Sequence, residues 1–180
     1  MKAVHKFDNR FSFSLGERER VDIEAIKQNI AGCRFVEKTD EKTDRKGIDY
    51  IATLRGGSKV NIDAKARDKG CSNYWREGPE LALETWSVIP EKGKNGKTGW
   101  TLSESSEVDL ILFTFDPTDS KMFYLIPFQH LRMAFRKNCN NWMKVYKVDR
   151  QQSDSWRSEC VFVPANKVIK AINELMIISA

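Results

Sequence analysis

The chain has 180 residues and a formal net charge of +5 at pH 7, and 41% of its residues are hydrophobic. This length suits one domain, and the hydrophobic fraction is high enough for a folded core, which excludes a disordered chain. No apolar stretch approaches the roughly 20 residues of a membrane helix, and no signal-peptide run follows the N-terminus. The sequence therefore predicts a single domain over residues 1–180 in a cytoplasmic protein with no membrane segment.

The basic surplus fits a polyanionic partner without requiring one. A zinc site has little support, because the chain has two histidines and none of its cysteines forms a CxxC pair. We therefore expect reduced cysteines without a chemical role at four positions: Cys33, Cys71, Cys139 and Cys160.

The first predicted element is a helix over residues 17–31. Ser14 is a candidate N-cap with Glu17 as its capping-box partner, and Gly32 is a candidate C-cap. Helical spacing carries the apolar stripe of this helix back to Glu19. The stripe consists of Ile23, Ile26 and Ile30.

A short strand is predicted over residues 34–38, followed by a charged loop and a β-hairpin. Residues 48–55 and 59–66 form the two hairpin strands. The Gly56-Gly57 pair between them is typical of a primed turn, because glycine tolerates the positive φ that such turns require.

The remaining sequence is predicted to form further strands and two helices. Residues 108–115 are nearly continuously apolar, which is typical of a central strand covered on both faces. The other predicted elements are strands over 81–89, 121–128, 142–148 and 159–163, a short helix over 129–137 and an amphipathic helix over 165–178. This order indicates an α/β fold with a mixed central sheet flanked by helices.

The hairpin carries the residues that point to chemistry. Side chains alternate along a strand, so Asp63 and Lys65 share one face, and Asp49 on the partner strand can lie close to Asp63. Glu19 lies on the helix stripe that packs on this sheet, so three carboxylates and one lysine can converge. Such a set suits metal-assisted phosphodiester hydrolysis. The carboxylates would hold Mg²⁺ or Mn²⁺, and the lysine would act on the attacking water or on charge developing at phosphorus.

The order of acidic helix, Asp49, Gly-Gly turn, Asp63-Ala64-Lys65 and buried strand resembles the PD-(D/E)XK nuclease superfamily. The resemblance covers about residues 14–66, and Ile48 stands where the family often has proline. It implies a restriction-endonuclease-like domain that the strands and helix of residues 140–180 complete. The catalytic set that it implies is Glu19, Asp49, Asp63 and Lys65, with the three acids as metal ligands.

The same resemblance implies a Mg²⁺-dependent nuclease, with DNA favoured as the substrate and endonuclease cleavage favoured over exonuclease cleavage. The remainder of the chain is similar to small nucleases of phages and mobile elements. Many nucleases of this type pair to cut both strands, which suggests a homodimer. The alternative is a catalytically silent protein of the same fold that binds nucleic acid or a host protein.

Simpler interpretations stay open for each residue. Asp63 and Lys65 can form a plain surface ion pair, and Asp49 can be a turn residue. Glu19 can be a solvated glutamate at the helix start, with Glu17 and Glu24 as rivals for its role. Glu84 is either a further metal-site carboxylate or a member of an ion pair.

Two basic groups are candidate contacts for a phosphate backbone, and a solvated lysine-rich surface is the alternative. One is the glycine-containing loop with Lys92, Lys94 and Lys97. The other lies within residues 132–150 and includes Arg132, Arg136 and Lys137.

Overall fold

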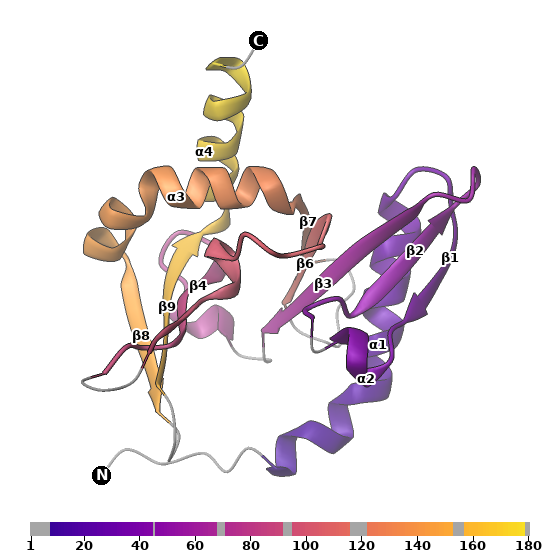
Figure 1. Cartoon of the computed structure of the whole chain (residues 1–180), viewed down its shortest axis with the longest axis horizontal. Coiled ribbons are helices and arrows are strands. Elements are labelled where there is room, and N and C mark those ends of the chain that lie inside the picture. Colours follow the sequence, from indigo (N-terminus) through magenta and orange to yellow (C-terminus); the bar gives the residue numbers. More distant parts are fainter. Residues whose placement is uncertain are drawn as a thin grey trace.

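The computed structural model describes residues 8–44, 46–67, 71–91, 95–115, 122–152 and 157–178, which form two sheets and several helices (Figure 1). The first sheet is mixed, with the order β1-β2-β3-β6-β7; its strands are β1 (Cys33–Lys38), β2 (Tyr50–Leu54), β3 (Lys59–Arg67), β6 (Leu110–Phe115) and β7 (Phe123–Pro127). The second is antiparallel, with the order β5-β4-β9-β8; its strands are β4 (Glu80–Val88), β5 (Lys97–Thr98), β8 (Lys147–Gln152) and β9 (Arg157–Pro164). The helices are α1 (Asp8–Asn29), α2 (Glu41–Asp44), α3 (Phe128–Val145) and α4 (Ala165–Ile178), with 3-10 turns η1 (Cys71–Tyr74) and η2 (Trp100–Leu102). The predicted α/β class is confirmed.

The predicted hairpin and buried strand form the centre of the first sheet. β2 pairs antiparallel with β3 over Lys59–Ile62, whereas β6 pairs parallel with β3 from Ile62 to Arg67. The second half of β3 therefore has a neighbour on the β6 side but no strand beside it on the β2 side. This open edge positions the candidate site.

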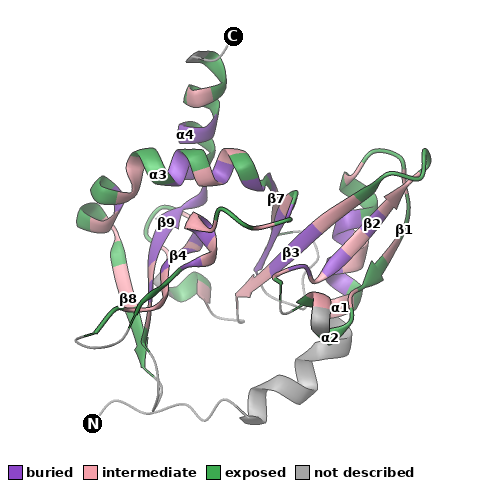
Figure 2. Cartoon of the chain, in the orientation of Figure 1, coloured by how far each residue is buried: buried purple, intermediate pink, exposed green. Residues whose placement is uncertain are grey.

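Apolar side chains cover both faces of this sheet, and buried residues lie in the sheet and in the elements on either side of it (Figure 2). On one face Ala25 and Ile26 of α1 pack on Ala52, Ile62 and Ala64. On the other face a larger cluster joins β6 to the second sheet, α3 and α4; its members include Ile111, Phe113, Leu81, Leu83, Val161, Phe135 and Val168. Because β3 is in parallel register with β6, Asp63 and Lys65 point to the same side as Ile111 and Phe113.

The second sheet differs from the prediction of one central sheet. Strands β4, β8 and β9 pair with one another instead of joining the first sheet. Leu81 and Leu83 of β4 and Val161 and Val163 of β9 are fully buried in the cluster that lies against β6. Their alternating apolar positions are thus satisfied by packing a second layer over the first sheet.

Two predicted helix boundaries were wrong. α1 begins at Asp8, so Ser14 lies inside the helix and is not its N-cap; no glycine or proline interrupts residues 8–15. It ends at Asn29, and Gly32, at φ +74°, lies in the turn to β1. α3 continues to Val145 where a strand was predicted from residue 142, because Trp142 is buried on the apolar side of α3, where it contacts Phe135.

The hairpin turn also differs in detail from the predicted primed turn. Gly57 has a φ of +83° and donates its N–H to the Leu54 carbonyl. Gly56, in contrast, does not have a positive φ. A type I′ turn requires positive φ at both central residues, so the conformation is instead a turn closed by one left-handed glycine.

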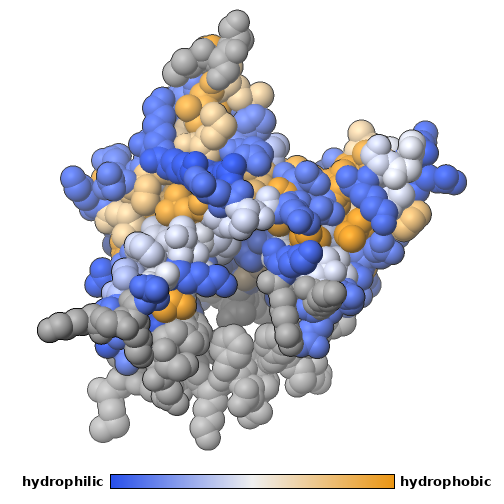
Figure 3. All heavy atoms as spheres, in the orientation of Figure 1, coloured by the Kyte–Doolittle hydropathy of each residue, from blue (hydrophilic) through white to orange (hydrophobic). Residues whose placement is uncertain are grey.

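α4 projects from the body of the molecule (Figure 1). Hydrophilic side chains dominate the face shown in Figure 3, and hydrophobic ones gather along this helix. No helix in the described part of the chain is long and apolar enough to cross a membrane. All four cysteines are free thiols.

Candidate active site at the open edge of β3

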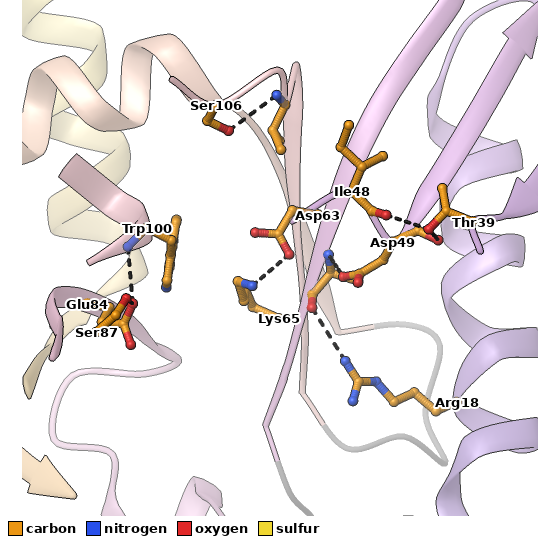
Figure 4. A network of polar contacts seen from close by, with 12 residues as sticks. Arg18, Thr39, Ile48, Asp49, Asp63, Lys65, Glu84, Ser87, Trp100 and Ser106 are labelled. Carbon is orange, nitrogen blue, oxygen red and sulfur yellow. Dashed lines mark hydrogen bonds and ion pairs between the residues drawn. The ribbon is translucent and has the colours of Figure 1, made fainter. Parts of the chain in front are cut away.

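Asp49 takes the place of the missing strand partner at the open edge of β3. Its backbone N–H donates to the Ile62 carbonyl over 2.9 Å, and its carboxylate Oδ2 accepts from the Ala64 N–H at 2.6 Å. Thr39 hydrogen-bonds the Ile48 and Asp49 carbonyls and fixes the chain just before β2. The Asp49 carboxylate is therefore held in the plane of the sheet, between the positions of Asp63 and Lys65 (Figure 4).

Asp63 and Lys65 form an ion pair on the face of β3 that looks toward Trp100 (Figure 4). Lys65 Nζ lies 2.6 Å from Asp63 Oδ1 and 5.3 Å from the centroid of the Trp100 ring. Asp63 is only 4% exposed, so the interpretation as a plain surface ion pair does not hold. The carboxylate oxygen in contact with Lys65 is Oδ1, so the ammonium offsets the charge of the buried aspartate.

Several acidic side chains crowd this edge. Burial raises the pKa of Asp49 above its ordinary value, and the neighbouring Asp63 charge adds to the effect, while the Ala64 N–H and Lys65 oppose it. Asp44 of α2 is a further carboxyl, and burial and its contact with Asp49 raise its pKa. Such mutual repulsion between carboxylates is relieved when a cation lies between them.

The structure does not bring Glu19 to this set. Glu19 is partly exposed and pairs with Lys38 of β1 at 3.2 Å. The buried acid of α1 is Asp22, which is 1% exposed and accepts a hydrogen bond from the Tyr50 hydroxyl at 3.2 Å. The spacing contains a signal for this residue, since Asp22 lies four positions before Ile26 on the buried side of the helix.

Asp22 is linked to the site through charge. Burial raises its pKa, and the Asp49 charge contributes in the same direction, while Arg18 and Tyr50 oppose the shift. Arg18 lies 3.7 Å from the Asp22 carboxylate and donates a hydrogen bond to the Ala64 carbonyl at 3.4 Å. α1 therefore contributes an acid and an arginine to the open edge of β3, although not the predicted glutamate.

The donor set at this edge fits a hard cation with few protein ligands. No group of three His, Cys, Asp or Glu side chains within the described ranges is arranged to hold a metal. Asp49 and Asp63 remain as two neighbouring carboxylates, close enough for the Asp63 charge to raise the pKa of Asp49. Mg²⁺ is commonly held by one or two carboxylates together with water and substrate phosphates, so this pair suits Mg²⁺ or Mn²⁺.

Glu84 lies on the opposite wall, in β4, and positions Trp100. Its Oε2 accepts hydrogen bonds from Ser87 Oγ at 2.7 Å and from the Trp100 N–H at 3.1 Å. Gly99 permits this close approach, because a Cβ there would lie 2.3 Å from the Glu84 carbonyl oxygen. In the described structure the Glu84 carboxylate is thus held by hydrogen bonds to Ser87 and Trp100. It takes neither of its two predicted roles, which were a member of an ion pair and a carboxylate of the metal site.

Trp100 lines two hollows that meet at the ion pair. One, of about 200 Å³, contains Asp63 and is also lined by Lys46, Lys97 and several serines. The other, of about 380 Å³, contains Lys65 and lies between the two sheets. The acid and the lysine of the pair therefore each face a space that a ligand can enter.

The predicted basic groups have different environments. Lys97 lines the hollow that contains Asp63, while Lys92 and Lys94 lie outside the described residues. Arg132 donates to the Ser103 carbonyl at 2.7 Å, and Arg136 pairs with Glu104 at 2.8 Å. These two arginines therefore attach residues 103–104 to α3. The remaining predicted member, Lys137, is exposed on α3.

Comparison with known proteins gives no match to any family model, curated protein or solved structure. The chemistry of the site must therefore be inferred from its own geometry. Sequence reasoning missed Asp22, Asp44 and Lys46 as members of this neighbourhood.

Proposed function

We propose that the protein is a divalent-metal-dependent nuclease that hydrolyses phosphodiester bonds, with DNA as the favoured substrate. The observation that supports this most is a buried aspartate with a lysine 2.6 Å away, next to a second carboxylate that is held at the open edge of the same strand. A purely structural ion pair has no need of a second, like-charged carboxylate. The proposal also draws on the resemblance of the sequence to PD-(D/E)XK nucleases.

In this proposal Asp49 and Asp63 hold Mg²⁺ or Mn²⁺. When bound, the metal supplies Lewis-acid polarisation of the phosphodiester and a water of lowered pKa. In the hydrolysis, a water oxygen would form a bond to phosphorus while the bond from phosphorus to the leaving sugar oxygen breaks. The proton that the water loses would pass to solvent, and the sugar oxygen would take up a proton from solvent. Asp49 is positioned for its role by the Ala64 N–H and by the chain before β2.

Lys65 contributes positive charge and N–H donors beside the reacting group. Its ammonium is held between Asp63 and the face of Trp100, so it is fixed before substrate binds. A preorganised donor of this kind stabilises the negative charge that develops on the phosphoryl oxygens in the transition state. Lys46 and Lys97, at the hollow that contains Asp63, are suited to the phosphates of the substrate backbone.

The test is a cleavage assay on supercoiled plasmid, linear duplex and single-stranded circular DNA, with Mg²⁺ and with Mn²⁺. We expect wild type to cut at least one of these substrates and EDTA to abolish cutting. Asp63→Asn should lose at least 100-fold in rate, in the range found when one group that stabilises the transition state is removed.

Glu37→Gln is a suitable control, because Glu37 is exposed on β1. Its rate should equal that of wild type. Equal cutting by Asp63→Asn and wild type would remove Asp63 from the reaction. No cutting by wild type on any substrate would favour the alternative of a catalytically silent protein of this fold. The proposed endonuclease action and the homodimer remain predictions, and the form of the plasmid products decides the first.

A further inference from the structure

The larger hollow beside Trp100 carries a charge pattern that hydrolysis at Asp63 does not itself require. It has a volume of about 380 Å³, and its charged lining residues are Arg18, Lys65, Arg67 and Glu84. Glu84 is already hydrogen-bonded through Oε2 to Ser87 and to the Trp100 backbone. Because Arg18 and Lys65 also pair with acids outside this lining, the suitability of the hollow for an anion depends on Arg67.

Arg67 is the cation best placed to bind a ligand there. Arg18 pairs with Asp22, and Lys65 pairs with Asp63, but Arg67 has no carboxylate partner within the described ranges. Its guanidinium carbon lies 4.4 Å from the centroid of the Phe162 ring. A guanidinium that stacks on an aromatic face keeps the N–H donors around its edge available, and these donors match the geometry of a phosphate.

The position of the hollow relates it to the reacting bond. Lys65 lines it and also contacts Asp63, so a ligand in the hollow is a direct neighbour of a phosphodiester bound at Asp63. The remaining lining includes the rings of Trp100 and Phe162 and the polar side chains Gln151 and Ser158, which can bind the edges of a base.

We infer that this hollow is a subsite for one nucleotide of an unpaired strand, with its phosphate on Arg67, adjacent to the bond that is cut. The inference rests on the proposed nuclease function. The volume is near the lower end of the range for ligand pockets, about 300–1,000 Å³, which suffices for one nucleotide. A base pair with both of its backbones is too large for this volume. The preferred substrate is thus a single strand, a frayed end or a flap.

The experiment measures binding without cleavage. Fluorescence anisotropy in EDTA compares a labelled single-stranded oligonucleotide with a blunt hairpin duplex of matched composition. Arg67→Gln should weaken binding of the single strand by about tenfold and reduce its log–log salt slope by about 0.7. Binding of the hairpin should change less than twofold. Arg34→Gln, an exposed arginine on β1, is the matched control and should behave as wild type with both ligands.

A second variant keeps the test decisive if Arg67→Gln folds poorly. Arg67→Lys retains the charge without the planar fork and should weaken single-strand binding by about threefold.

Oligonucleotides with and without terminal phosphates should bind equally, because the ligand is an internal phosphodiester. A requirement for a terminal phosphate would overturn that assignment.

The outcomes separate this inference from the proposed function. An equal loss of hairpin and single-strand binding in Arg67→Gln would overturn the assignment to an unpaired strand, as would no loss with either ligand. Selective loss of single-strand binding in a protein that cuts nothing with Mg²⁺ or Mn²⁺ would support the subsite and overturn the nuclease.

Discussion

At the scale of single residues, the site places buried carboxyl groups where they do not favour folding. Asp22 and Asp63 are almost completely buried, and Asp49 is buried in part beside Asp63. Burial raises the pKa of Asp22 and of Asp49, which means that their charged forms are destabilised in the folded protein. Local arrangements that oppose stability are expected where function requires them.

The pH dependence of the free energy of unfolding tests how much the burial of the Asp22 carboxylate destabilises the fold. Its folded pKa lies above the ordinary value of 3.8, so its contribution to stability is complete below 3.8 and is lost as the pH rises through the raised value. Asp22→Asn removes this titration and keeps an acceptor for the Tyr50 hydroxyl. The free energy of unfolding of the variant, relative to wild type, should therefore increase with pH across this window, by at most about 1.4 kcal/mol per pH unit. Urea unfolding between pH 4 and pH 7 measures it, and a difference that shrinks as the pH rises would contradict the burial of a charged group.

Asp63 gives a test of the metal that does not depend on activity. Calorimetric titration with Mn²⁺ should show binding to wild type that falls by at least about tenfold in Asp63→Asn, because one of the two carboxylates is lost. Glu37→Gln serves as the control with an unchanged affinity. If Asp63→Asn and wild type bind Mn²⁺ equally, Asp63 is not a ligand.

At the scale of elements, the pattern of the sequence predicts most of the first sheet. The alternation in residues 48–66 and the apolar run 108–115 depend on local periodicity, and β2, β3 and β6 appear where they indicate. Boundaries and turn geometry depend on packing instead. α3 extends to Val145 because Trp142 is buried, and the hairpin requires one left-handed glycine where two were expected.

The two hairpin glycines form a matched pair for mutation. Gly57 has a φ of +83°, and a Cβ on either glycine would meet no atom within 4 Å, so the difference between them is conformational. Gly57→Ala should destabilise the protein by about 1–2 kcal/mol because a non-glycine residue is strained in this region. Gly56→Ala should be neutral or stabilising by up to about 1 kcal/mol. Thermal unfolding of both variants tests the turn, and equal effects would argue against it.

At the scale of the whole molecule, the second sheet was not predicted from the sequence, and it forms the side of the candidate site opposite β3. It carries Glu84, which positions Trp100 opposite Lys65, and it forms one wall of the larger hollow. The pairing of β4 with β9 joins residues about 80 positions apart, and no local pattern specifies such a contact. The same limit explains why Glu19 was wrongly placed at the site. Helical spacing indicated a buried stripe on α1, but the packing of the helix on the sheet buries Asp22 and leaves Glu19 paired with Lys38.

The hollow that contains Asp63 gives a prediction for the polyanion surface. Lys46 and Lys97 both line it, and each phosphate contact that is lost reduces the log–log salt slope by about 0.7–0.9. The double variant Lys46→Ala/Lys97→Ala should therefore flatten the slope of DNA binding by about 1.4–1.8. A double variant at the exposed Lys27 and Lys59 is the control and should retain the wild-type slope. The parental slope and affinity in Lys46→Ala/Lys97→Ala would mean that these lysines are only solvated.

The central claim is that the ion pair on β3 is catalytic, and Lys65→Ala tests it most directly. The measurement is the single-turnover cleavage rate of wild type and Lys65→Ala on the substrate that wild type cuts best, together with the dissociation constant for that substrate in EDTA. Lys65 acts on charge that develops only in the transition state, so the rate should fall by about 10²–10³, while the dissociation constant changes by less than about fivefold. Equal single-turnover rates for the two proteins would contradict the account.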